Sequence, residues 1–276
     1  MYKTLFVSDL DGTLLNQKQE LSHFTCRTLN ALIQKGVPFT YATARSLTTA
    51  KEVTQGLDIQ LPVVVYNGAF IKSAVSGESV LARQFSDKEK QDILSKHLIH
   101  GIYPRVYALH SGEERFSYIE TKISNGTRDY LCKRRNDKRS RPTTEEQLLD
   151  GEVFCFSSID DYEKLFSLYE VLKSTYHTVL YKDPYTSEHW LEVLPQLATK
   201  ADAILALKEI YGFERVVVFG DEKNDISMFA VADESYAVLN ANESVKRAAN
   251  DVIASNNSDG VAKYMLSRYE QYCDAK

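Results

Sequence analysis

The stretch KTLFVSDLDGTL at residues 3–14 joins a short apolar run to two closely spaced carboxylates. The run KTLFVS has the length and composition of a strand buried in a parallel sheet. Asp9 and Asp11 come directly after it, and Gly12 allows the backbone to turn sharply. In an extended segment, side chains at i and i+2 point the same way, so we expect the two carboxylates to be neighbours. Because ligands of doubly wound sheets lie beyond the carboxyl ends of the strands, the stretch predicts an acidic site there.

Strand-like apolar runs alternate with helical stretches in the first and last parts of the chain. The first part predicts helices over 22–35 and 47–57, and strands over 37–42 and 62–66. The last part predicts helices over 201–211, 226–232, 243–249 and 259–272, and strands over 215–219, 236–239 and 251–254. Such alternation is typical of a parallel sheet with right-handed crossover helices. We therefore predict a doubly wound, Rossmann-like α/β domain.

The alternation breaks between these two parts. Residues 69–84 predict a hairpin, and the segment after it predicts helices and strands without strict alternation. The expected helices cover about 88–100 and 160–174, and the expected strands cover 105–109, 116–120, 153–157 and 178–182. We therefore expect a discontinuous core, residues 1–84 and 190–276, that is interrupted by an inserted α+β domain over residues 85–189.

Composition excludes several classes of protein. The chain has 276 residues, enough to bury a sizeable core, and a formal net charge of -5, which argues against a dedicated nucleic-acid binder. No apolar run approaches the length of a membrane span, and the apolar start of the chain is too short for a signal peptide. Four widely spaced cysteines are typical of reduced thiols in a cytoplasmic protein: Cys26, Cys132, Cys155 and Cys273. We expect a small-molecule partner, with no nucleic acid and no membrane, and a monomer is compatible with this composition.

A second acidic motif, GDEKND at residues 220–225, follows another expected strand. Taken alone, the acids of this second motif are explained equally well by the dipole of a following helix. The first motif, taken alone, could also be an ordinary turn or a calcium loop, but this explanation is the less favoured one. Asp221 and Asp225 would, however, join the first two carboxylates at one edge of the same sheet. Carboxylates packed so closely repel one another unless a cation relieves them. Oxygen ligands of this kind suit Mg²⁺, so the two motifs together predict a magnesium site.

Three further segments lie at expected strand ends or helix starts. Thr43-Ala44-Arg45 offers a hydroxyl and backbone N–H groups to a phosphate, although a threonine there is more often a helix cap. Lys200 opens an expected helix, where it opposes the helix dipole, and in isolation it is most simply a solvated side chain. Asn67-Gly68 is most simply a turn. Their place at the ligand-binding edge makes all three candidates for substrate binding.

These motifs, in this order, resemble those of the haloacid dehalogenase (HAD) superfamily, and in particular the Cof-type phosphatases with a IIB-type cap. DLDGTLL at residues 9–15 is similar to the nucleophile loop of the family, and ATAR at 42–45 to its threonine motif. Lys200 lies at the place of the family's lysine, and GDEKND is similar to the family's acidic motif. NGA at 67–69 is similar to the sequence found at this place in the Cof-type branch. The resemblance spans nearly the whole chain. The pairing of DLDGT with GDEKND is far more specific than either motif alone.

The resemblance implies a hydrolase of phosphoric monoesters that works through an aspartyl-phosphate. Asp9 would be the nucleophile, and Asp11 would be the general acid and base. Mg²⁺ would bind the Asp9 and Asp221 carboxylates and the main-chain carbonyl of Asp11. The phosphoryl oxygens would be held by Thr43, the N–H groups of Leu10 and Ala44, Lys200 and Asn224. Support for the site would come from Gly12, Arg45, Asn67 and Asp225.

Two departures from the family pattern concern the backbone. The family more often has glycine where this chain has Ala44, and glycine often follows the lysine where this chain has Ala201. Alanine keeps the N–H group that binds phosphate, but a left-handed backbone at either place would be strained.

The resemblance also implies that the inserted domain, the cap, selects the substrate. Within it, KRRNDKRSR at residues 133–141 is strongly basic, which suits an anionic substrate or partner but is most simply explained as a solvated loop. We expect the substrates to be small phosphorylated metabolites such as sugar phosphates, nucleotides or cofactor phosphates. Two alternatives stay open: a phosphosugar mutase that uses the same aspartate, and a catalytically silent metabolite-binding regulator.

Overall fold

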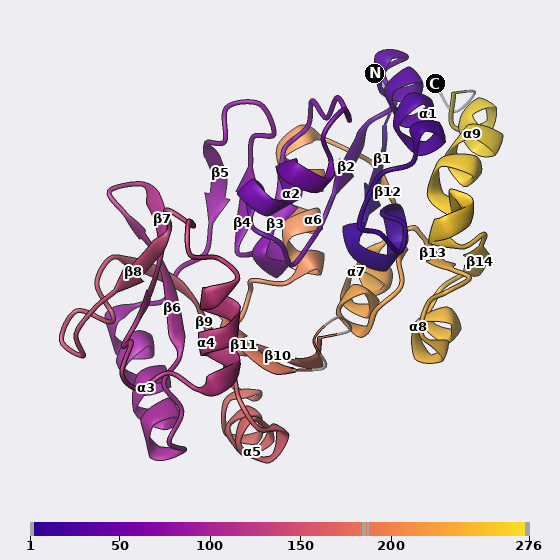
Figure 1. The fold of residues 1–276 in the computed structure, drawn as a ribbon. Helices are drawn as coiled ribbons and strands as arrows, with labels where there is room; N and C mark the ends of the chain where they lie inside the picture. The colour runs from indigo at the N-terminus through magenta and orange to yellow at the C-terminus, as the bar shows by residue number, and fades with distance from the viewer. Residues whose placement is uncertain (1–2, 184–185, 187, 274–276) are drawn as a thin grey trace. The chain divides into compact units, whose positions relative to one another are not determined.

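The structure, a computed structural model, describes residues 3–183, 186 and 188–273 and contains two compact units (Figure 1). The core unit comprises Met1–Ala82 and Ala198–Lys276, and the inserted unit comprises Arg83–Leu197. The second boundary lies later than the expected 189/190, because β11 (His189–Leu194) pairs with strands of the inserted unit. The sequence predicted no strand over these residues, so it gave no indication of the sheet that they join.

The core unit is built on a parallel sheet with the strand order β14-β13-β12-β1-β2. Its strands are β1 (Thr4–Ser8), β2 (Phe39–Tyr41), β12 (Arg215–Gly220), β13 (Glu234–Val238) and β14 (Asp251–Ile253). All neighbouring pairs are parallel. The chain moves outward in one direction from β1 and in the other direction from β12, so the strand order reverses between these two strands. This confirms the predicted doubly wound α/β fold, and its topological switch point lies at the ends of β1 and β12.

A small antiparallel sheet extends the core unit. β3 (Val63–Val65) is connected to the parallel strands by a bridge between Ala42 and Val64. It pairs with β4 (Phe70–Lys72), which pairs in turn with β5 (Ser79–Ala82). β4 and β5 form the hairpin that the sequence predicted.

The helices of the core unit are α1 (His23–Gln34), α2 (Leu47–Val53), α6 (Lys200–Tyr211), α7 (Ile226–Val231), α8 (Glu243–Ala248) and α9 (Gly260–Cys273). Helix α1 packs against α9, and α6 packs against α7. At the start of α6, the side chain of Thr199 accepts a hydrogen bond from the N–H of Asp202. This cap makes Lys200 the first residue of the helix. Within the described residues, no helix is both long and apolar enough to cross a membrane.

The inserted unit has a sheet with the strand order β10-β11-β9-β6-β7-β8. Its strands are β6 (Arg105–His110), β7 (Glu113–Tyr118), β8 (Ser140–Pro142), β9 (Glu152–Ile159), β10 (His177–Lys182) and β11. Its helices are α3 (Asp87–Ile99), α4 (Asn125–Cys132) and α5 (Tyr162–Leu172). Neighbouring strands are antiparallel except β7 and β8, which are parallel. The unit is therefore an α+β fold.

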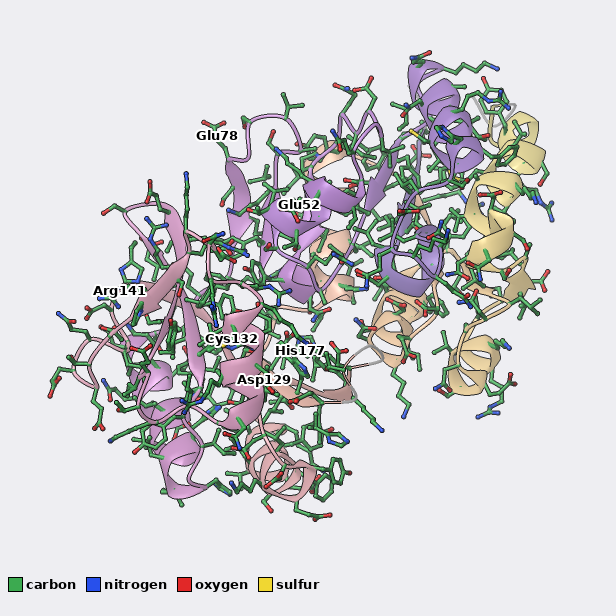
Figure 2. The ribbon with its side chains drawn as sticks, in the orientation of Figure 1. Glu52, Glu78, Asp129, Cys132, Arg141 and His177 are labelled. Atoms are coloured by element: carbon green, nitrogen blue, oxygen red, sulfur yellow. The ribbon has the colours of Figure 1, made fainter. Side chains whose placement is uncertain are left out.

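The sequence did not predict α4, β8 and β11. Helix α4 (NGTRDYLC) is short and mostly polar, and β8 (SRP) lies inside the basic run and is held by its pairing with β7. Two arginines of that run are used in structural ion pairs. Arg139 contacts Glu114 and Asp137, and Arg141, labelled in Figure 2, contacts Asp150. Part of the basic run is therefore neutralised within the unit.

The two faces of this sheet carry different side chains. Val106 of β6 and Phe156 of β9 join Ile93 and Leu165 of the helices in a hydrophobic core. Side chains alternate along a strand, so Arg105 points to the opposite face. That face is partly covered by α4.

His97 of α3 lies in this core and predicts a loss of stability in acid. It is fully buried, its Nδ1 lies 2.8 Å from the Ile93 carbonyl oxygen, and its ring stacks on Phe156. Burial lowers the pKa of His97 to about 4. As the pH falls from the usual histidine range towards that value, His97 becomes protonated in the unfolded chain but stays neutral in the folded chain. The free energy of unfolding should therefore fall by about 3 kcal/mol over this window.

The measurement is urea unfolding of wild type and His97→Phe at neutral pH and at about pH 4. Phenylalanine keeps a ring against Phe156 but cannot be protonated, so the variant should lose less stability in acid than the wild type. Equal losses in the two proteins would contradict this account of His97.

Candidate active site

The ends of β1 and β12 lie side by side because Ser8 is paired with Phe219. Asp9 continues β1 in an extended conformation, and its N–H donates to the Phe219 carbonyl oxygen at 2.9 Å. The chain then makes a tight turn in which Gly12 has a φ of +79°. A Cβ atom at Gly12 would lie 2.2 Å from Asp221 Oδ2, so glycine is needed both for the left-handed backbone and for the close approach. The turn thereby brings the first acidic motif against the second.

Lys200 joins the two acidic motifs. Its Nζ donates to Asp9 Oδ1 at 2.6 Å and to Asp225 Oδ1 at 2.7 Å. The Lys200 side chain is 1% exposed, which rules out the simple alternative of a solvated lysine. Charged side chains are buried this deeply only when they are paired. Three segments that are distant in sequence therefore meet at one buried ion-pair network.

Asp225 is fully occupied by hydrogen bonds to protein groups. Its Oδ1 accepts from Lys200, and its Oδ2 accepts from the N–H groups of Asp221 at 2.9 Å and Glu222 at 3.0 Å. Gly220 leaves room for this arrangement, because a Cβ atom there would lie 2.6 Å from Asp225 Cβ. Asp225 therefore orients both the lysine and the loop that carries Asp221.

The cluster of Asp9, Asp221 and Asp225 contains more negative charge than Lys200 neutralises. One carboxylate oxygen of each lies within 4.8 Å of the others. Burial, together with the charge of Asp225, raises the pKa of Asp221 to about 7, although a hydrogen bond from Thr13 opposes the shift. Burial also raises the pKa of Asp9 well above its usual range, against the attraction of Lys200. Burial disfavours the charged form of Lys200, but the two neighbouring carboxylates outweigh it and raise its pKa.

Asp11 has a cationic partner of its own. Arg45 Nε donates to Asp11 Oδ2 at 2.7 Å, and Arg45 Nη2 donates to Asp11 Oδ1 at 2.6 Å and to Gln19. We expected the carboxylates of Asp9 and Asp11 to be neighbours. In the structure the chain turns after Asp9, and Asp11 is not part of the three-carboxylate cluster, although its charge contributes to the raised pKa of Asp9.

Asn67 connects two of the remaining candidates. It is 2% exposed, its N–H donates to the Thr43 carbonyl oxygen at 3.0 Å, and its Oδ1 accepts from Asn224 Nδ2 at 3.2 Å. Thr43 is not the cap of α2, because Ser46 takes that role. The Thr43 hydroxyl accepts a hydrogen bond from the N–H of Arg45 at 3.1 Å. The hydroxyl proton is therefore available to a ligand.

The Asn67-Gly68 segment is more than an ordinary turn. Tyr66, Asn67 and Gly68 have φ values of +51°, +52° and +102°. Left-handed conformations of residues other than glycine cost free energy and persist only where the surroundings enforce them. A Cβ atom at Gly68 would lie 2.1 Å from the carbonyl oxygen of Thr199, the residue before Lys200. This turn therefore packs directly on the backbone that starts α6.

Sequence reasoning missed Thr13 and Asn240. The Thr13 hydroxyl donates to Asp221 Oδ1 at 2.8 Å, and Asn240 Nδ2 donates to the Gly12 carbonyl oxygen at 2.8 Å. Thr13 lies in the first acidic motif, and Asn240 directly follows an expected strand. These positions at strand ends are the sequence feature that could have indicated both residues. The two alanines that depart from the family pattern, Ala44 and Ala201, do not have positive φ values. The strain that a left-handed backbone would cause is therefore absent at both.

Comparison with known proteins identifies the class of protein to which this fold and site belong. The model of the haloacid dehalogenase-like hydrolase family matches residues 6–265, so the chain belongs to this family. This confirms the family expected from the motifs, and it makes the chain an enzyme of the hydrolase class.

Individual relatives narrow the comparison. The chain is 29% identical over 280 residues to the 5-amino-6-(5-phospho-D-ribitylamino)uracil phosphatase YwtE of Bacillus subtilis, covering 93% of this chain and 95% of that protein. The crystal structure of TM0651 from Thermotoga maritima is 26% identical, with a TM-score of 0.76 and 97% of each chain covered. The HAD subclass IIB sugar phosphatase BT4131 shares the fold, with 22% identity, a TM-score of 0.75 and coverage of 96% and 98%.

Proposed function

We propose that the chain is a Mg²⁺-dependent phosphatase that hydrolyses small phosphorylated metabolites through an aspartyl-phosphate on Asp9. The observation that carries the proposal is the buried contact of Lys200 with Asp9 and Asp225 at the switch point of the sheet. Acidic residues that only interact with a helix dipole would remain exposed to solvent. The carboxylates of Asp9, Asp221 and Asp225 instead share a buried site. Perturbed, closely packed ionisable groups at a ligand-binding edge are a mark of catalytic sites.

The donor set fits a Mg²⁺ ion. Magnesium prefers oxygen ligands. Asp9 and Asp221 each have one carboxylate oxygen without a hydrogen-bond partner among the described residues, whereas both oxygens of Asp225 are occupied. We therefore propose Asp9 and Asp221 as the carboxylate ligands and Asp225 as a support, and the family resemblance adds the main-chain carbonyl of Asp11 as a proposed third ligand. When bound, the ion would withdraw negative charge from the phosphoryl group and from the carboxylate cluster.

Asp9 is the proposed nucleophile. Lys200 holds its Oδ1, and this contact orients the carboxylate and favours its ionised form within a buried site. Attack on phosphorus forms a bond between Asp9 and the phosphoryl group and breaks the bond to the oxygen of the leaving group. The result is an aspartyl-phosphate and a leaving group that needs a proton.

Asp11 is the proposed general acid and base. It would protonate the leaving oxygen and later take a proton from the water that attacks the aspartyl-phosphate, which releases phosphate and restores Asp9. A carboxylate whose two oxygens both accept hydrogen bonds from Arg45 is not free to donate a proton to a substrate. The mechanism therefore requires Asp11 to leave Arg45 during the reaction.

The transferred phosphoryl group needs positioning and charge neutralisation more than covalent chemistry. The groups proposed to supply them are Thr43, Lys200, Asn224 and the N–H groups of Leu10 and Ala44. Asn67 supports two of these groups through its hydrogen bonds to Thr43 and Asn224.

The substrate is proposed to be a small phosphorylated metabolite that the inserted unit helps to select. Its relative YwtE is named for a phosphorylated ribitylamino-uracil, which is a molecule of this kind. Cys26, Cys132 and Cys155 are free thiols, and the side chain of Cys273 lies outside the described residues. The free thiols support the proposed cytoplasmic location.

The proposal is tested by initial rates of phosphate release from a panel of phosphorylated metabolites and a generic aryl phosphate, with Mg²⁺ and with a chelator. Removal of the metal should lower the rate by about a hundredfold or more, because a bound cation supplies several kcal/mol of charge stabilisation. Equal rates with and without the chelator would contradict a metal-dependent mechanism. Conversion of a sugar phosphate to its isomer without phosphate release would favour the mutase instead, and no turnover on any compound would favour the silent regulator.

A further inference from the structure

The inserted unit contains a buried arginine that is only partly satisfied. Arg105 of β6 is 0% exposed, and its Nη2 donates to Ser157 Oγ at 2.8 Å. Its Nε and Nη1 have no hydrogen-bond partner among the described residues. Buried N–H groups without partners cost free energy, especially on a charged side chain. Such groups in a native structure call for an explanation, and a ligand is one.

Aromatic rings surround the guanidinium. Arg105 Cζ lies 3.8 Å from the ring centroid of Tyr130, 4.8 Å from that of Trp190 and 5.9 Å from that of Tyr107. We call these four residues the Arg105 cage. Trp190 Nε1 is another buried donor without a partner within the described part of the chain. Cation–π contacts compensate the charge of Arg105 in part, but they leave Arg105 Nε, Arg105 Nη1 and Trp190 Nε1 without an acceptor among the described residues.

The cage lies on the sheet face that does not contribute to the hydrophobic core of the inserted unit. Helix α4 supplies Tyr130, and its neighbours Asp129 and Cys132, labelled in Figure 2, are exposed. Tyr130 is only half-buried, and Arg134 stacks on its ring at 4.0 Å. Tyr130 is therefore the member of the cage that an exposed helix contributes.

We propose that the Arg105 cage binds a planar ring that carries an anionic or carbonyl oxygen. The unpartnered donors of Arg105 and Trp190 need acceptor oxygens, the positive charge favours an anion, and the surrounding rings favour stacking.

Trp190 is the single tryptophan of the chain, so its fluorescence reports on the cage in the full-length protein. The probes are benzoate and cyclohexanecarboxylate, which carry the same charge but differ in planarity. Benzoate should change the Trp190 emission saturably and should bind several-fold more tightly than its saturated analogue, because only the planar ring stacks. Arg105→Lys keeps the charge but loses the planar fork, and it should weaken benzoate binding about tenfold or more.

Two variants serve as controls. Lys133→Gln removes a charge from an exposed residue next to α4 and should leave benzoate binding unchanged. Asp9→Asn should also bind benzoate normally, because Asp9 lies in the core unit. Binding in that variant separates a failure of the cage from a failure of the phosphatase mechanism.

The proposal is overturned if wild type shows no saturable response to benzoate by fluorescence and by calorimetry. It is also overturned if both carboxylates bind equally, or if a folded Arg105→Lys protein binds benzoate as tightly as wild type. Arg105 would then be a structural cation–π residue only. The comparison of the two probes on wild type decides the question even if Arg105→Lys fails to fold.

Discussion

Asp9→Asn should reduce phosphate release by a factor on the order of 10⁴ or more, because removal of a covalent nucleophile leaves only binding and charge stabilisation. An amide oxygen accepts the hydrogen bond from Lys200 as the carboxylate does, so the variant should remain folded. The measurement is the rate of phosphate release from an aryl phosphate under saturating Mg²⁺, together with thermal unfolding. Trapping of a phosphorylated protein in the wild type but not in the variant would identify the covalent intermediate.

The matched control is Asp58→Asn, which makes the same chemical change at an exposed aspartate of the core unit. It should leave both the rate and the unfolding temperature unchanged within error. A folded Asp9→Asn protein with activity near wild type would exclude Asp9 as the nucleophile.

Lys200→Met should destabilise the core unit and abolish activity. The substitution leaves Asp9 and Asp225 buried without their shared cation, and loss of one partner from a buried ion pair costs about 3–5 kcal/mol. Urea unfolding in the presence of a chelator measures this loss. Mg²⁺ should restore part of the stability but not the rate, because the cation that holds Asp9 Oδ1 is still missing.

Two comparisons sharpen this prediction. Adding Asp225→Asn to Lys200→Met removes one of the two buried carboxylate charges that have lost their cation. The double variant should therefore be more stable than Lys200→Met, and it should stay inactive. Lys208→Met changes a partly exposed lysine of the same helix, whose contact with Asp233 is 3.4 Å long, and should cost less than about 1 kcal/mol. Equal effects of the Lys200 and Lys208 substitutions on stability would show that the buried network is not energetically important.

Local patterns in the sequence were sufficient for the parts of the fold that depend on periodicity. Buried runs such as that before Asp9 predicted parallel strands, and the alternation of strands and helices predicted the doubly wound sheet. The polar helix α4 and the short edge strand β8 escaped prediction, because neither has an apolar pattern of its own. Their formation depends on a helix cap at Ser124 and on pairing with β7.

The candidate site was predictable where its residues directly follow strands. Asp9 and Asp221 continue paired strands, so their proximity follows from the topology of the sheet. The partner of Asp11 was not predictable, because it depends on the turn that Gly12 makes and on the position of Arg45 after another strand. Thr13 was missed although it lies in the first motif, because its hydrogen bond to Asp221 joins two segments that are distant in sequence. A local sequence pattern does not reveal such a contact.

The sequence by itself determined that KTLFVSDLDGTL ends a buried strand in two carboxylates, and that a second acidic loop ends another strand of the same sheet. Hydrophobic periodicity and chain order are local properties, and they were enough for this. Only the tertiary structure decided that Lys200 lies between Asp9 and Asp225, that Gly12 and Gly68 are needed for close backbone approach, and that β11 joins the inserted unit with Trp190 against Arg105. These are contacts between segments that are distant in sequence, and their energies depend on burial and distance, which exist only once the chain has folded.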